Sequence, residues 1–197
     1  MRMIRQLLIA AASVIWVCSA SAAVTIHGVK VEDTATVAGS TLQLNGAGTR
    51  YKAIFKVYVA GLYTSKKVST LEELVAAPGP KRLSMTFLRE VEAGPFGKLL
   101  TRGVEDNTTK PEMSKLVPGL IRMAEIFSRY KNLVPGDVVT IDWIPGTGMV
   151  VTVNTKGQAQ VQDEAFKEAE FYKAIMSIWF GASPADHLLK DAMLGIK

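Results

Sequence analysis

The order of strand-like and helix-like segments is the feature that most limits how this chain can fold. Runs rich in β-branched and aromatic residues, separated by turn residues, fill most of the first half and return after residue 136. The predicted strands cover residues 24–31, 40–44, 55–63, 81–88, 137–143 and 149–155, with a further strand at 158–162. The run Pro145-Gly146-Thr147-Gly148 predicts a hairpin turn between two of them.

The helical segments carry recognisable start and stop signals. Thr70 with Glu73 predicts a capping box for a short helix over residues 71–76, and a second helix fits 94–105. Thr109 with Glu112 predicts a helix to residue 130, and Pro118 inside it predicts a kink or a split. Apolar periodicity predicts a helix from residue 163 to 180, and a last helix starts at the cap signal in residues 183–186.

This order predicts a single α+β domain over residues 24–197. Strands, then helices, then a hairpin and helices favour one large antiparallel sheet with a helical layer on one face. The sequence shows no internal repeat and no long linker that would divide it, and the length suffices for a sizeable core.

Residues 1–23 have the pattern of a secretory signal peptide. Arg2 and Arg5 precede an apolar run over residues 7–17, which the small residues 19–23 follow. That run is about 11 residues long, short of the roughly 20 that a membrane span needs, so we expect cleavage between Ala22 and Val24 without an anchor. The expected location is periplasmic or secreted. Cys18, the one cysteine, would leave with the signal, which excludes thiol chemistry in the mature chain.

Charge and motif content narrow the function further. Without Arg2 and Arg5, 21 basic residues face 18 acidic ones, and they are scattered, so a nucleic-acid partner is not expected. The histidines, His27 and His187, lie far apart in the sequence, so neither a metal site nor another cofactor is expected. The sequence contains no P-loop and no G-x-S-x-G motif.

Four runs, in order along the chain, carry a resemblance to a known family: LNGAGTR (44–50), FKVYVAGLY (55–63), GPFGKL (94–99) and WFGASP (179–184). Together they resemble the chalcone isomerase-like superfamily, in its bacterial secreted branch. The resemblance implies an open-faced β-sandwich, in which a large antiparallel sheet and a helical layer enclose a ligand cleft. This agrees with the α+β prediction made from the segments alone.

The resemblance also implies which residues would form the site. The arginine that ends the glycine-rich run of the isomerases is similar to Arg50. Their other four polar positions, a threonine, a tyrosine, an asparagine and a second threonine, fall at Tyr58, Met113, Leu120 and Ile178. Three of these replacements cannot donate a hydrogen bond to a developing enolate, so most of the isomerase machinery is changed. We therefore lean against an enzyme.

An apolar lining with one retained cation suits a ligand with a long apolar body and an anionic head. The fatty-acid-binding branch of the family uses an arginine and a tyrosine to hold a carboxylate, and Arg50 with Tyr58 is similar to that pair. Residues 50 and 58 have the same parity and share a sheet face unless a bulge intervenes, as do Lys52 and Lys56. The sequence thus predicts a non-catalytic binder of a fatty acid or similar amphiphile. An isomerase-type lyase and a helper protein with a vestigial cleft remain as alternatives.

Overall fold

The computed structural model describes residues 23–156, 161–162 and 164–196. The predicted signal peptide, apart from its last residue, lies outside this range, as do residues 158–160 of the predicted last strand. The main sheet is built from seven strands: β3 (Thr34–Val37), β4 (Ser40–Lys52), β5 (Phe55–Thr64), β6 (Lys81–Phe87), β9 (Val138–Ile144), β10 (Gly148–Asn154) and β11 (Val161–Gln162). Two smaller two-stranded sheets pair β1 (Val24–Ile26) with β2 (Val29–Val31), and β7 (Val91–Glu92) with β8 (Asn132–Leu133).

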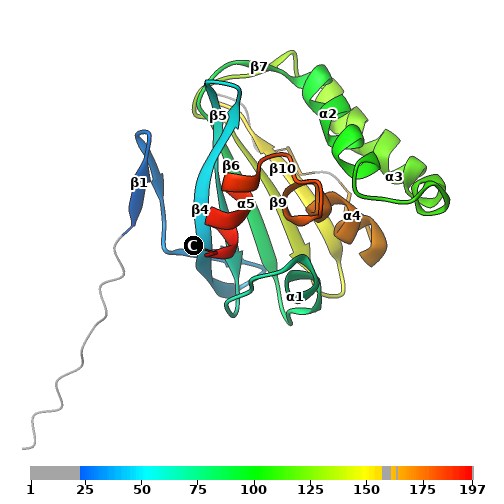
Figure 1. Ribbon diagram of the computed structural model, residues 1–197, viewed down its shortest axis with the longest axis horizontal. Coiled ribbons are helices and arrows are strands. Elements are labelled where there is room, and N and C mark those ends of the chain that lie inside the picture. Colours follow the sequence, from blue (N-terminus) through cyan, green and yellow to red (C-terminus); the bar gives the residue numbers. More distant parts are fainter. Residues whose placement is uncertain (1–22, 157–160, 163, 197) are drawn as a thin grey trace, which may run out of the picture.

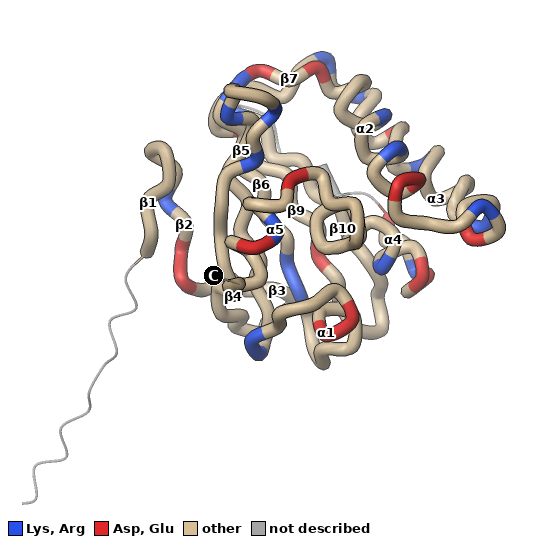
Figure 2. The backbone as a smooth tube through the Cα atoms, in the orientation of Figure 1, with Lys and Arg blue, Asp and Glu red and all other residues tan. Residues whose placement is uncertain are grey.

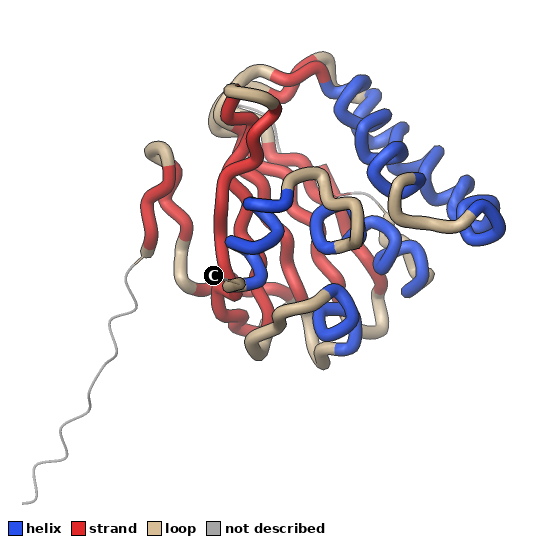
Figure 3. The backbone as a smooth tube through the Cα atoms, viewed as in Figure 1, coloured by secondary structure: helices blue, strands red, loops and turns tan. Residues whose placement is uncertain are grey.

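The main sheet is antiparallel throughout, in the order β11-β10-β9-β6-β5-β4-β3. Within the described residues, five helices accompany it: α1 (Leu71–Ala76), α2 (Ala93–Glu105), α3 (Lys110–Ser128), α4 (Ala169–Phe180) and α5 (His187–Leu194). Figure 1 and Figure 3 show the helices gathered over one side of the curved sheet, with the α2–α3 pair standing at its upper end. The predicted α+β class is confirmed.

The two faces of the sheet have different partners. The helix-side core contains Tyr58, Ala60 and Leu62 of β5 together with the buried residues of all five helices. From Tyr58 a row of edge-to-face rings leads through Phe87 and Phe96 to Phe127 of α3, with centroid separations of 5.7, 5.4 and 5.2 Å. The opposite face holds a smaller cluster beneath the β1–β2 hairpin, which includes Val31 and Val59.

The glycine-rich run continues as strand, whereas the sequence predicted that this strand ends at residue 44. Helix α5 packs directly on β4 there: a Cβ at Gly46 would lie 2.2 Å from the Ala192 carbonyl oxygen, and one at Gly48 would lie 2.8 Å from the Ala192 Cβ. Asn45 bulges out between Leu44 and Gly46, and its amide nitrogen donates to the Val68 carbonyl (2.9 Å) and the Met193 carbonyl (2.8 Å). Close packing against a helix therefore explains why glycines occupy this strand.

Three other predicted boundaries were wrong. The strand over 24–31 is a hairpin, because His27 (φ 49°) and Gly28 (φ 81°) form a left-handed turn. The helix predicted from residue 163 starts at Ala169, since Phe166 instead bridges to Met149 of β10 through two backbone hydrogen bonds. The last helix is capped by Asp186, whose side chain accepts from the Leu189 amide, three residues later than the predicted start.

Pro118 does not split α3, which is one helix from residue 110 to 128. The proline is exposed, so the carbonyl that loses its amide partner there can be hydrated. The capping signals at Thr70 and Thr109 are confirmed. The Thr70 hydroxyl accepts from the Glu73 amide at 3.1 Å, and the Thr109 amide donates to the Glu112 carboxylate at 3.0 Å.

Candidate functional site

Arg50 and Tyr58 lie directly opposite each other on β4 and β5. Residues opposite one another on antiparallel strands place their side chains on the same face, here the face beneath the helices. Tyr58 is buried, at 4% exposed, while the Arg50 side chain retains 23% of its accessible surface. The pair thus joins a phenol in the core to a guanidinium at the core's edge.

A β-bulge lies next to this pair, and the predicted placement of Lys56 was wrong. The register changes from Arg50–Tyr58 to Tyr51–Lys56, which leaves Val57 as an extra residue on β5. Lys56 was predicted to share the face of Arg50, but it pairs with Tyr51 and lies on the other face. There its Nζ lies 3.1 Å from His27 Nδ1 of the β1–β2 turn. Lys52, two residues from Arg50 on β4, keeps the face of Arg50.

The Tyr58 hydroxyl accepts a hydrogen bond from the indole nitrogen of Trp179 on α4, at 2.9 Å. Because an indole nitrogen only donates, the hydroxyl retains its own proton for a second partner. Burial raises the pKa of Tyr58 to about 12, although the Trp179 hydrogen bond and the Arg50 charge oppose that shift. Tyr58 is therefore a neutral hydrogen-bond donor at ordinary pH.

Asp186 connects the start of α5 to this pair. One carboxylate oxygen caps the helix, and the other accepts from the Tyr51 amide at 2.9 Å. The same second oxygen lies 3.5 Å from Arg50 Nη1, a long contact for a charged pair. Among the described residues, Asp186 is the one ion-pair partner of Arg50. A guanidinium has five donors, so this single contact leaves capacity for another anion.

The three predicted wall residues lie in helix contacts of the core. Ile178 (3% exposed) meets α2, where a Cβ at Gly103 would lie 2.9 Å from its side chain. Leu120 of α3 is buried and Met113 is half-buried against the same core. In the described structure these residues pack against neighbouring side chains, and the cavity described below is lined by none of the five predicted site residues.

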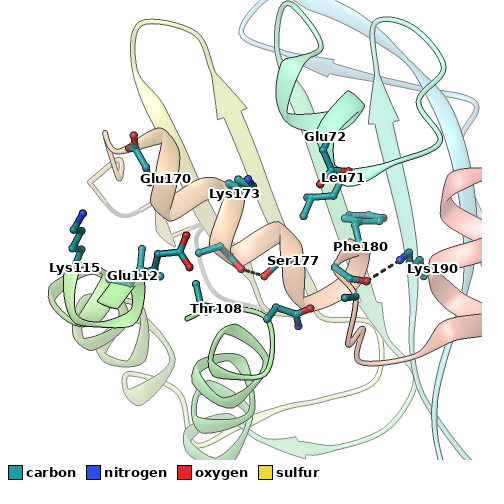
Figure 4. Close-up of a pocket in the computed structure, with 15 residues that line it drawn as sticks. Leu71, Glu72, Thr108, Glu112, Lys115, Glu170, Lys173, Ser177, Phe180 and Lys190 are labelled. Atoms are coloured by element: carbon teal, nitrogen blue, oxygen red, sulfur yellow. Dashed lines mark hydrogen bonds between the residues drawn. The ribbon is translucent and has the colours of Figure 1, made fainter. Parts of the chain in front are cut away.

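A cavity of about 600 Å³ lies along the outer side of α4 (Figure 4). Its charged lining carries both signs in equal number and consists of Glu72, Glu112, Glu170, Lys115, Lys173 and Lys190. Some of these groups already have partners: Lys190 Nζ donates to the Gly181 carbonyl at 2.8 Å, and Glu112 caps α3. This cavity, called the α4 groove below, therefore has balanced charge and faces solvent.

In the described part of the chain, no group of three or more histidine, cysteine, aspartate or glutamate residues is placed to hold a metal ion. Among the described residues, no helix has both the length and the apolarity to cross a membrane.

A family model described as chalcone isomerase-like matches residues 23–195. The chain belongs to the chalcone isomerase-like family. A fatty-acid-binding protein of Arabidopsis thaliana has a similar solved structure, with a TM-score of 0.65 and 13% sequence identity, covering 88% of this chain and 96% of that chain. At this identity the likeness shows a shared fold. A search of curated proteins found no match.

Within this chalcone isomerase-like domain, the sequence did not identify two residues that complete the Arg50 site. Trp179 belongs to a motif of the resemblance and Asp186 to the predicted start of the last helix, but neither was assigned to the site. Asp186 lies 136 positions from Arg50 in the chain. No local sequence pattern predicts a contact between residues so far apart.

Proposed function

We propose that this chain is a non-catalytic binder of a fatty acid or a similar amphiphile, with the carboxylate held by Arg50. The observation that carries the proposal is the geometry of the guanidinium. It lies at the edge of an apolar core, faces a neutral tyrosine donor and has one long ion-pair contact. A ligand carboxylate can meet it with two charge-assisted hydrogen bonds.

The apolar part of the ligand would follow the ring row behind Tyr58. An acyl chain that extends from Arg50 past Tyr58 meets Phe87 and then Phe96 of α2. These rings fill the space, so α2 and α3 must move outward to admit the chain. Met113, Leu120 and Ile178 are the proposed walls of the opened cleft, because all three are apolar and lie on α3 and α4.

Shared fold and site chemistry both support this choice over isomerisation. A solved structure of the same fold belongs to a protein named for fatty-acid binding. Met113, Leu120 and Ile178 cannot donate hydrogen bonds to an enolate, whereas they suit an acyl chain. We further propose that the protein acts in the periplasm or outside the cell, on the strength of the charged, apolar and small-residue segments in residues 1–23.

Calorimetric titration with a long-chain acid and the matching alcohol tests the proposal. We expect the acid to bind more tightly, and Arg50→Ala to weaken its binding by roughly 1.5–3 kcal/mol, the usual value of a hydrogen bond to a charged group. Arg50→Lys restores only part, because a lysine lacks the planar fork. Tyr58→Phe costs about 1 kcal/mol.

Lys173→Ala is the matched control, because it removes a cation from the α4 groove instead. Its acid affinity should equal that of the wild type. Equal affinity for acid and alcohol, or unchanged acid binding in a folded Arg50→Ala variant, would show that Arg50 has a structural role only.

A further inference from the structure

The tip of the β4–β5 hairpin exposes an unbroken run from Lys52 to Lys56. Within it Ile54 is 84% exposed and Phe55 is 52% exposed. Single apolar residues on a surface are ordinary, but two adjacent ones at a projecting tip form a small patch. Figure 1 shows this hairpin at the end of the sheet opposite α1.

Turn chemistry does not account for these residues. The turns at His27-Gly28 and Ala38-Gly39 place glycine at the second position, with φ of 81° and 77°. The β4–β5 turn instead has Ala53 at φ 53°, followed by Ile54. Asparagine and glycine are favoured in such turns, and an exposed isoleucine gains nothing from burial. The fold therefore gives no reason for Ile54.

Cations surround the apolar tip. Lys52 and Lys56 flank it in sequence, and the Arg89 guanidinium carbon lies 4.5 Å from the centroid of the Phe55 ring. The neighbouring acid, Glu90, is hydrogen-bonded to Asn132. Figure 2 shows basic positions on this hairpin and acidic positions further along, towards β7. Apolar side chains ringed by lysine and arginine match an anionic lipid surface, because the apolar side chains enter the interface and the cations meet the phosphates.

The tip also lies beside the proposed ligand site. Arg50 is two residues from Lys52 on the same strand and the same face. A membrane that contacts the tip would therefore lie close to the guanidinium, where an amphiphile can pass without crossing water.

We propose that the β4–β5 tip, through Ile54, Phe55, Lys52, Lys56 and Arg89, docks this protein on anionic lipid bilayers. Only the transfer of ligand at the bilayer rests on the proposed function; the docking itself does not. Arg50 then meets the carboxylate of an amphiphile drawn from the outer lipid layer.

Co-sedimentation with lipid vesicles tests the docking. The probes are vesicles of phosphatidylcholine alone and vesicles with added phosphatidylglycerol. We expect wild-type protein to bind the anionic vesicles at least tenfold more tightly, and binding to fall steeply in high salt. The double variant Ile54→Ser/Phe55→Ser should lose at least tenfold in vesicle affinity. Each of Lys52→Gln and Lys56→Gln should lose about fivefold.

Leu99→Ser/Ile121→Ser is the matched control, since these side chains on α2 and α3 are 50% and 57% exposed. It should bind vesicles within twofold of the wild type. Absence of wild-type binding, or an equal loss in the control, would overturn the proposal. So would a dimer that dissociates in the tip variant without lipid, which would make the tip a self-association surface.

Fatty-acid titration without vesicles separates the two proposals. The tip variants should keep wild-type acid affinity, and Arg50→Ala should keep wild-type vesicle binding. A protein that binds acid but no vesicles would refute the docking alone. Vesicle binding without acid binding would refute the ligand proposal and leave the docking intact.

Discussion

The α4 groove and the Arg50 site differ in charge balance. The groove encloses about 600 Å³ and is lined by three lysines and three glutamates, which face solvent. At the Arg50 site the cation has a single ion-pair contact, at 3.5 Å, next to a buried tyrosine. Opposed charges in water offer little net attraction to an ion, whereas a cation at an apolar edge with only one long ion-pair contact attracts an anion more strongly. Volume alone therefore does not identify a binding site.

Helix α4 separates the two regions, and its opposite sides serve them. Trp179 points into the core and donates to Tyr58, while Lys173 lines the groove. Variants on this one helix can therefore distinguish the two regions without changing its length or capping.

The largest difference is expected in stability. Trp179→Ala should lower the free energy of unfolding by about 3–5 kcal/mol, because it removes a ring that is 1% exposed and leaves a cavity. Lys173→Ala should change it by no more than about 0.5 kcal/mol, as is usual at a surface. Urea unfolding followed by circular dichroism measures both. Comparable losses in the two variants would mean that the groove side of α4 contributes as much as the core side.

A second difference is expected in alkali. Since the folded state raises the pKa of Tyr58 from 10.0 to about 12, the folded protein retains a proton that the unfolded chain releases first. The raised pKa of Tyr58 contributes fully to the free energy of unfolding below pH 10. This contribution, about 2.7 kcal/mol for a two-unit shift, is lost as the pH rises towards 12. Unfolding at pH 9 and pH 12 should show that loss in wild type and a correspondingly smaller one in Tyr58→Phe. Identical pH profiles would indicate that Tyr58 ionises as freely folded as unfolded.

The smallest effect concerns competition for Arg50. Asp186→Asn keeps a good helix cap but removes the charge that contacts the guanidinium, so acid binding should tighten by up to about 1 kcal/mol. Calorimetry with a long-chain acid measures it. Glu72→Gln, which removes a carboxylate from the groove, is the control and should leave affinity unchanged. Weaker binding in a folded Asp186→Asn variant would mean that Asp186 positions Arg50 for the ligand.

Local signals in the sequence predicted the elements that depend on local physics. The capping boxes at Thr70 and Thr109 and the hairpin before Gly148 were found because a few neighbouring residues determine them. The extension of β4 through Gly46 was not found, because its cause is a helix made nearly 150 residues later. Counting alternate residues from Arg50 misplaced Lys56, because the two-residue turn pairs Lys52 with Phe55. The same count placed Tyr58 with Arg50 only because the bulge at Val57 offsets that turn. A one-residue insertion changes the face of every later side chain, and periodicity alone cannot locate it.

The seating of α5 on β4 has a consequence for how the protein is made. Asn45 and Met193 are hydrogen-bonded although 148 positions separate them, and synthesis proceeds from the N-terminus. The side of β4 that carries Gly46 and Gly48 is therefore bare until α5 has been made, and such late, non-local closure slows folding. A chain cut just before His187 would lack α5 although every strand of the main sheet had been translated. Such a chain would leave the Gly46–Gly48 face of β4 uncovered and open to chaperones and proteases.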